Sequence, residues 1–288
     1  MSSISHQKAN AIQAIFGKDR VIIGVVHCPA LPGSPRHFGE AFKTTLRIAM
    51  DDAVAYARGG VDGLIIENHG DIPFLKPDEI GPETAASLAV ITDRIAQQVD
   101  LPLGINVLAN AAIPALAVAK AGGAHFIRVN QWANAYVANE GFVEGEAARA
   151  LRYRAKIGAR DVAVFADAHV KHGAHAIVAD RSVAELVRDV EFFDADAVIA
   201  TGQRTGDAAT TAEIETVRSG TALPVLVGSG VSHANIGTIL PLVDGVIVAS
   251  ALKEGGVWWN RVESARVVDF MAKVRTIRER LGEAEACP

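Results

Sequence analysis

The chain is poor in cysteine, in aromatic residues and in long apolar runs. Only two of its 288 residues are cysteines, Cys28 and Cys287, too few for a disulfide framework and without the spacing of a structural zinc site. No apolar run approaches the ~20 residues that cross a bilayer. The N-terminus lacks the charged-then-apolar layout of a signal peptide. We therefore expect a cytoplasmic protein without membrane insertion.

An excess of positive charge is also lacking. The formal net charge is −5 and no long basic run occurs, so nucleic acid is not an expected partner. Half of the residues are hydrophobic, enough for one large core. No linker-like or low-complexity segment divides the chain, which predicts a single domain over residues 1–288. Within it, we expect a helical extension over 1–20 and a flexible tail over 282–288.

What the chain does contain is an alternation of short apolar runs with longer amphipathic segments. Apolar runs with the length of buried parallel strands lie at residues 21–26, 62–67, 103–108, 125–129, 162–166, 197–200, 225–227 and 245–249. Segments with helical character lie at 42–58, 82–99, 113–121, 144–157, 182–193, 211–219 and 233–240, and a long final helix is predicted over 261–281.

This alternation predicts an α/β fold, a (β/α)8 TIM barrel with a short N-terminal helix over 5–16 and a long C-terminal helix. The alternative is an open doubly wound sheet, which would normally carry a GxGxxG turn after its first strand. Here the first strand ends at His27-Cys28-Pro29 instead, which favours the closed barrel. Barrels of this size often dimerise, so a homo-oligomer is expected.

Chemistry in such barrels collects at the C-terminal ends of the strands, where polar residues stand in this chain. The candidates for catalysis are the titratable residues His27, Glu67, Asp167 and Lys171. The candidates for orienting a substrate are Asn68, Asn106, Arg128, Asn130, His169 and Thr201. We expect either Glu67 or Asp167 to act as a general base, and we expect burial in the barrel mouth to raise its pKa. Lys171 or His27 would stabilise an enolate oxygen, and a Schiff base on Lys171 is a less favoured role.

The last two strands end in small residues, the place where many barrels bind phosphate. Free backbone N–H groups there, with helix N-termini beside them, can hold a dianion. The candidates for binding phosphate are Gly202, Arg204, Gly228, Ser229, Gly230 and Ser250, with Lys253 close by. The alternative is that Gly228 and Gly230 merely allow tight turns.

No cofactor is predicted, but a divalent metal is left open. His27, Glu67 and Asp167 would converge on an ion if all three point inward, which makes a metal-dependent hydrolase an alternative. The histidines at 169, 172 and 175 also invite a metal interpretation, although they lie in a loop. The pair Trp258-Trp259 is interpreted as core filler, a subunit contact or a wall of the ligand site.

Segments spread over almost the whole chain resemble the BtpA/SgcQ family. They are GVVHCPALPGSP (24–35), GVDGLIIENHGDIPF (60–74), GINVLANAA (104–112), FIRVNQW (126–132), VFADAHVKH (164–172), and PVLVGSGV with DGVIVASALK near the end. That family is similar to the ribulose-phosphate-binding barrels, so the resemblance implies a (β/α)8 fold and supports a phosphate site. Other members lie among genes for sugar uptake and sugar metabolism, and the family's name reflects a proposed part in photosystem I biogenesis.

Some positions depart from the family's pattern. Residues 131–134 (QWAN) and 138–141 (ANEG) stand where members carry His-Thr-Gly and Thr-Asp-Gln-Gly types, and His69 stands where an aromatic is common. Our leading hypothesis is an isomerase, epimerase or lyase that abstracts a proton from a phosphorylated sugar or related small phosphometabolite. The alternative from another class is a non-catalytic assembly or stability factor for a membrane complex such as photosystem I.

Overall fold

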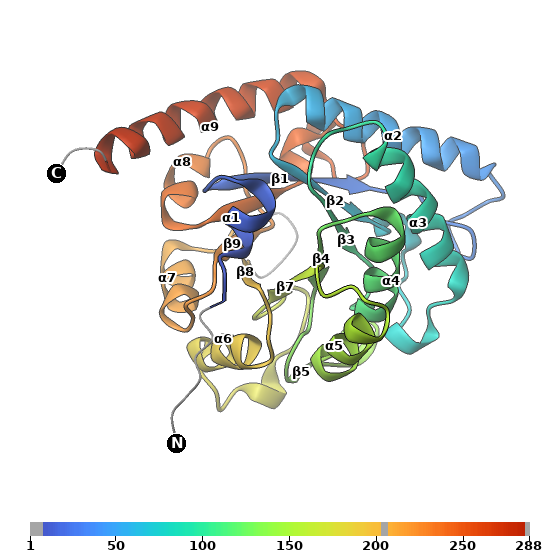
Figure 1. Ribbon diagram of the computed structural model, residues 1–288, viewed down its shortest axis with the longest axis horizontal. Coiled ribbons are helices and arrows are strands. Elements are labelled where there is room, and N and C mark those ends of the chain that lie inside the picture. The colour runs from blue at the N-terminus through green and yellow to red at the C-terminus, as the bar shows by residue number, and fades with distance from the viewer. Residues whose placement is uncertain (1–7, 203–206, 286–288) are drawn as a thin grey trace.

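Eight parallel strands form a closed ring at the centre of the protein (Figure 1). The computed structural model describes residues 8–202 and 207–285, with side chains up to residue 282. In ring order the strands are β1 (Val21–His27), β2 (Gly63–Glu67), β3 (Leu103–Asn106), β4 (Phe126–Val129), β7 (Ala163–Asp167), β8 (Ala197–Thr201), β9 (Val225–Gly228) and β10 (Gly245–Val248). Because β10 pairs with β1 in parallel, the ring closes, and the predicted (β/α)8 barrel is confirmed.

Helices follow the strands and surround the ring (Figure 1). They are α2 (Phe42–Gly59), α3 (Pro82–Ala96), α4 (Ala112–Gly122), α5 (Ala147–Lys156), α6 (Val183–Phe192), α7 (Thr211–Ser219), α8 (Ile236–Ile239) and α9 (Ser264–Glu285). Helix α7 begins and ends at the residues that the sequence predicts. At the start of α6, Ser182 and Glu185 form the predicted capping box, in which each side chain bonds the backbone N–H of the other residue. Among the described residues, no helix is both long and apolar enough to span a bilayer.

Two helices near the C-terminus differ from their predicted extents. Helix α8 is much shorter than 233–240, and a 3₁₀ turn that contains Pro241, Leu240–Leu242, follows it at once. Helix α9 starts at Ser264 rather than 261, because Val262 is held in an extended bridge with Lys253. It continues to Glu285, past residue 282, where the sequence predicted a flexible tail.

A β-hairpin that the sequence analysis did not predict lies beyond β4. It pairs β5 (Ala135–Ala138) with β6 (Gly141–Glu144), so the helix expected from residue 144 begins only at Ala147. The hairpin's strands are short and carry small or polar residues at half their positions, which gives a weak strand signal. Tyr136 and Val143 pack with Val170 of the loop after β7, and this contact fixes the hairpin against the barrel.

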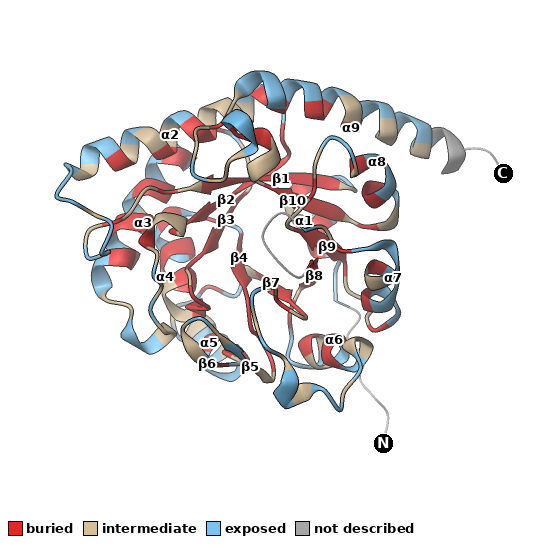
Figure 2. Ribbon diagram, turned by 180° about the vertical axis from the view of Figure 1, so that it is seen from behind, coloured by how far each residue is buried: buried red, intermediate tan, exposed pale blue. Residues whose placement is uncertain are grey.

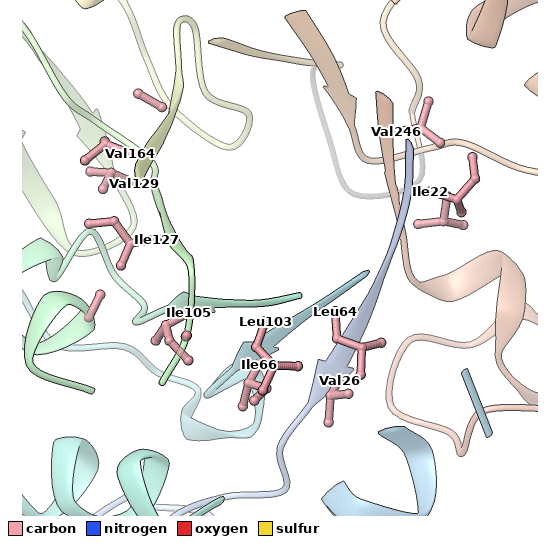
Figure 3. Packing of buried hydrophobic residues seen from close by; sticks show 14 of the residues in the cluster. Ile22, Val26, Leu64, Ile66, Leu103, Ile105, Ile127, Val129, Val164 and Val246 are labelled. Carbon is pink, nitrogen blue, oxygen red and sulfur yellow. The ribbon is translucent and has the colours of Figure 1, made fainter. Parts of the chain in front are cut away.

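Side chains alternate between the inside and the outside of the ring because successive strand residues point to opposite faces. The outward set, which includes Ile22, Val26, Leu64 and Ile66, packs under the helices (Figures 2 and 3). The inward set fills the barrel and is made of Val21, Ile23, Val25, Ile65, Phe126, Phe165, Ala197, Ile199, Leu226 and Ile247. The short helix α1 (Ala11–Phe16) belongs to the inward cluster, since the Phe16 and Phe126 ring centroids lie 5.9 Å apart.

We predict that Phe126→Ala lowers the free energy of unfolding by about 3–5 kcal/mol, the usual cost of emptying a buried phenylalanine site. Phe126 is fully buried and stacks on Phe165 with centroids 4.4 Å apart. Urea denaturation would measure the change. Phe192→Ala is the matched control, because Phe192 is 83% exposed and should alter stability by no more than about 0.5 kcal/mol. Equal losses in both variants would contradict the assignment of Phe126 to the barrel interior.

Candidate active site

The inward set of side chains becomes polar at the C-terminal end of the barrel. His27, Glu67 and Asn106 are direct neighbours in register across β1, β2 and β3. On β4 and β7, Arg128 and Asp167 take the next inward positions above Phe126 and Phe165. The strand period of two therefore gathers these groups into one ring of polar side chains at the mouth.

Two cavities open above this ring and share Glu67, His69, Arg128 and Lys171. The first, which we call the hairpin-side cavity, has a volume of about 370 Å³ and is also lined by Asn106, Asn130, Tyr136, Phe74 and Trp258. The second, which we call the Ser250-side cavity, has a volume of about 250 Å³ and is also lined by His27, Ser229, Gly230, Ser232 and Ser250. The shared residues make the two cavities parts of one site.

Glu67 is buried, and each of its carboxylate oxygens lies close to a side-chain nitrogen. Its Oε2 accepts a hydrogen bond from Asn106 Nδ2 at 2.6 Å, and its Oε1 lies 2.7 Å from His69 Nδ1. Burial alone would raise the pKa of Glu67, but the contact with His69 and the nearby positive groups outweigh it and lower the pKa below its usual range. The expectation that burial would raise this pKa was therefore wrong, and an ionised Glu67 is a weak base.

His27 lies beside Glu67 and is uncharged at neutral pH. Burial, and then the proximity of His69, lower the pKa of His27 to about 3. Its Nδ1 lies 3.0 Å from the carbonyl oxygen of Trp258 and its Nε2 lies 3.8 Å from Glu67 Oε1. The rings of His27 and His69 stack with centroids 4.4 Å apart, and Trp258 meets the His69 ring edge-on.

Asp167 does not face the substrate space as a free carboxylate. Arg128 donates to it twice, Nε to Oδ1 at 3.1 Å and Nη2 to Oδ2 at 2.9 Å, and Asn130 Nδ2 donates a third bond at 3.2 Å. Asp167 is 2% exposed and lines neither mouth cavity. The geometry makes it a positioning residue for Arg128 rather than the general base that the sequence suggested.

Lys171 stands between the two cavities on the loop after β7. Its Nζ donates to Ser229 Oγ at 3.0 Å, and its backbone N–H donates to Thr201 Oγ1 at 3.2 Å. Burial and then the neighbouring Arg128 lower the pKa of Lys171 to about 8. An amine with that pKa exchanges protons readily near neutral pH, which is the property of a general acid–base group.

Several predicted site residues lie away from the mouth cavities. Asn68 is a structural residue that bonds Asp71 and both backbone groups of Leu108. His169 and Thr201 line a separate cavity of about 150 Å³ beside α7. Lys253 is buried with its Nζ on the carbonyl of Asn260, outside the Ser250-side cavity. Gly202 and Gly228 also lie outside both mouth cavities, and Arg204 falls outside the described residues.

The glycines of the last strand ends have packing roles. Gly230 has a φ of +66°, and a Cβ there would lie 2.0 Å from the backbone nitrogen of Ala208. Gly228 faces Ile199 in the barrel interior. The sequence predicted that a helix would begin close to the turn after β9. Helix α8 begins only at Ile236, so no helix N-terminus lies at that turn. An anion in the Ser250-side cavity would therefore rely on Ser229, Ser250 and Lys171.

His69 and Trp258 complete the site; His69 is not among the candidate residues chosen from the sequence, whereas a wall of the ligand site was one of three interpretations of the pair Trp258-Trp259. His69 follows the end of β2 by two residues, and the signal that could have found it was its place beside Glu67 in the same strand-end segment. Within the described residues, the group whose ligand atoms lie close enough for one metal ion is His27, Glu67 and His69, all within 4.8 Å. Asp167, which the sequence analysis grouped with His27 and Glu67 as possible ligands of an ion, is not in this group, and His69 stands in its place.

Comparison with known proteins places the chain in a family. Residues 18–276 match the model of the BtpA family. A protein of Archaeoglobus fulgidus is 43% identical over 238 residues, covering 83% of this chain and 93% of its own length. The photosystem I biogenesis protein BtpA of Synechocystis is 38% identical over 257 residues, covering 89% of this chain and 88% of its own length.

Solved structures resemble the chain in fold. The N-(5'-phosphoribosyl)anthranilate isomerase of Pyrococcus furiosus has a TM-score of 0.54 at 11% identity and covers 89% of this chain and 99% of its own. The thiamine phosphate pyrophosphorylase of Pyrococcus furiosus has a TM-score of 0.53 at 13% identity and covers 89% of this chain and 96% of its own. At these identities the likeness shows the barrel and nothing finer.

We predict that the amine of Lys171 titrates with a midpoint near pH 8, because burial and Arg128 both disfavour its charged form. The rate of modification by an amine-selective reagent, followed peptide by peptide with mass spectrometry, should rise through that pH. The exposed Lys43 on α2 provides an internal comparison in the same samples. A midpoint for Lys171 at the ordinary value of lysine, about 10.4, would contradict the assignment.

Proposed function

The chain belongs to the BtpA family, and from that premise we propose that it is an enzyme acting on a phosphorylated sugar or a related small phosphometabolite. The reaction class that fits the mouth is proton transfer next to a carbonyl, as in an isomerase, an epimerase or a lyase. A cytoplasmic location and a homo-oligomeric state remain predictions from the sequence.

The observation that carries this proposal is the position of Lys171. It lines both cavities, contacts Ser229 and has a pKa of about 8. A group that transfers protons works best when its pKa lies near the operating pH. Because Glu67 is ionised and already bonded to Asn106 and His69, we assign proton transfer to Lys171 rather than to Glu67 or Asp167.

The phosphate of the substrate would occupy the Ser250-side cavity. Ser229 and Ser250 supply hydroxyl donors, and Lys171 and Arg128 line the same space with positive groups. A dianion bound there raises the pKa of Lys171 by favouring its charged form. The uncharged amine would take the proton next to the carbonyl, leaving the electron pair on the enolate, and the phosphate would stabilise the ammonium group that this transfer forms.

The body of the substrate would occupy the hairpin-side cavity. Asn130 Oδ1 is one of three buried side-chain atoms in the described part of the chain without a hydrogen-bond partner. An acceptor left unpaired in a buried place costs about 1–3 kcal/mol. A ligand that brings a hydroxyl to Asn130 removes that cost, and Asn106 and Asn130 both line this cavity. A polyhydroxylated substrate such as a sugar phosphate meets this requirement.

The assembly-factor hypothesis receives support from one relative, whose printed name assigns it to photosystem I biogenesis. Such a role would act through the protein surface and would not require the mouth. The two proposals separate in a binding assay, because only the enzyme hypothesis needs small phosphorylated ligands to stabilise the protein through residues of the two cavities.

We predict that a sugar phosphate at about 100 times its dissociation constant stabilises the protein by about 2.7 kcal/mol. The melting temperature would then rise by about 5–10 °C. Thermal-shift screening of pentose and hexose phosphates measures this. Ser250→Asp should abolish the shift, because it places a negative charge in the Ser250-side cavity. Ser219→Asp, the same change at an exposed residue ending α7, should keep it. An undiminished rise in the melting temperature of the Ser250→Asp variant would contradict the assignment of the phosphate to this cavity.

We also predict that Asn130→Ala weakens binding of a sugar phosphate about tenfold, the cost of one hydrogen bond of ~1.4 kcal/mol. Binding of inorganic phosphate should stay the same, because Asn130 lines the hairpin-side cavity and does not line the Ser250-side cavity. Isothermal titration of both ligands gives the comparison. A parallel loss for the two ligands would mean that Asn130 acts on the fold and not on the sugar.

A further inference from the structure

Two imidazoles and a carboxylate meet at one point of the barrel mouth. His27 ends β1, Glu67 ends β2 beside it in register, and His69 follows two residues later. Glu67 Oε1 lies 2.7 Å from His69 Nδ1 and 3.8 Å from His27 Nε2. Ligand atoms around one tetrahedral zinc ion lie roughly 3.3 Å apart when the bonds are about 2.0–2.1 Å long. These two separations bracket that spacing, and all three ligand atoms lie within 4.8 Å of one another, so side-chain rotations would close the cluster on an ion.

The proton positions around His27 also favour an ion. The carbonyl oxygen of Trp258 can only accept a hydrogen bond, so His27 Nδ1, at 3.0 Å from it, must carry the proton. In that tautomer Nε2 presents a lone pair toward Glu67 Oε1. The 3.8 Å between these two atoms is too long for a hydrogen bond. A cation bound to both atoms would satisfy the lone pair of Nε2 and a further lone pair of Oε1, which also lies 2.7 Å from His69 Nδ1.

The neighbours of the cluster orient it as a metal site requires. Histidine ligands commonly donate their second ring N–H to a backbone carbonyl, as His27 does to Trp258. The carboxylate oxygen of Glu67 that faces away from the histidines is held by Asn106 Nδ2 at 2.6 Å. The rings of His27 and His69 are stacked, so one of them must turn before both lone pairs can meet on one ion. The contacts with Trp258 and Asn106 prearrange the other ligand groups, His27 and Glu67, before any ion arrives.

We propose that His27, Glu67 and His69 bind one divalent transition-metal ion, with an open coordination position toward the two cavities. Two imidazole nitrogens and one carboxylate suit Zn²⁺, Fe²⁺ or Co²⁺, whereas Mg²⁺ and Ca²⁺ prefer oxygen ligands alone. Three protein ligands with a free position are the arrangement of catalytic metal sites. Glu67 and His69 line both cavities, which gives a ligand access to that position.

The metal site stands on this geometry, while its use in catalysis rests on the proposed function. A bound ion would polarise a substrate carbonyl as a Lewis acid, and Lys171 would transfer the proton. The Glu67–His69 contact has a competing explanation as a simple hydrogen bond, with His69 Nδ1 as donor. That explanation leaves the lone pair of His27 facing the carboxylate, and it predicts no tight metal binding.

Isothermal titration of the full chain with Zn²⁺, after dialysis against a chelator, tests the proposal. We expect one tight site per chain. Glu67→Gln and His69→Ala should each weaken Zn²⁺ binding by at least about 100-fold, and Asn106→Ala, which removes an outer hydrogen bond, by about 10–100-fold. His233→Ala should change nothing, because its half-exposed ring faces Asp269 on the surface. Visible absorption of the Co²⁺ form should be lost in the same variants.

The outcomes separate this proposal from the proposed function. Absence of a tight Zn²⁺ site in the unaltered chain overturns the metal site, and so does a site that survives both Glu67→Gln and His69→Ala. Thermal unfolding of each variant shows whether it is folded, and the titration of the unaltered chain decides the question even if one variant is not. Sugar-phosphate binding to the metal-free protein, lost in Ser250→Asp, would keep the proposed function whatever the Zn²⁺ titration shows.

Discussion

Closure of the parallel sheet is the constraint on which the rest of the molecule depends. In a closed ring each inward side chain has neighbours on both sides, and the register that pairs His27 with Glu67 and Glu67 with Asn106 is fixed by the hydrogen bonds of the strands. The lower inward positions are apolar and fill the barrel. The inward polar side chains therefore lie at the level where the strands end. The backbone of the strands sets the distances between them.

The fold and the location of the site could be predicted from the sequence because both depend on local periodicity. Apolar runs of strand length separated by helical segments define the barrel, and a polar residue at the end of such a run lies at the mouth. The hairpin β5–β6 escaped prediction because its stability comes from Tyr136 and Val143 packing on Val170, a contact distant in sequence. The end of α8 and the start of α9 likewise depend on the 3₁₀ turn Leu240–Leu242 and on the bridge between Lys253 and Val262.

The roles of individual site residues could not be predicted, because charge pairing across strands decides them. The sequence suggested that Asp167 is a free carboxylate. In the structure, Arg128 of β4 donates a hydrogen bond to each of its two carboxylate oxygens. Glu67 looked like a base with a raised pKa, but Asn106 and His69 stabilise its charge. For Lys171 the balance is the opposite. The nearby carboxylates raise its pKa less than burial and Arg128 lower it. These outcomes depend on distances that only the folded barrel sets.

The energetic cost of the mouth bears on the choice between an enzyme and a surface-acting factor. A partly desolvated lysine with a lowered pKa and a buried amide oxygen without a partner both reduce stability. Apolar replacements at these places would remove the cost, and a protein that works only through its outer surface would lose nothing by them. A bound ligand, by contrast, recovers the cost by bringing a charge to Lys171 and a hydroxyl to Asn130. The energetic cost of the polar mouth therefore favours the proposed small-molecule site, whether or not the outer surface also contacts another protein.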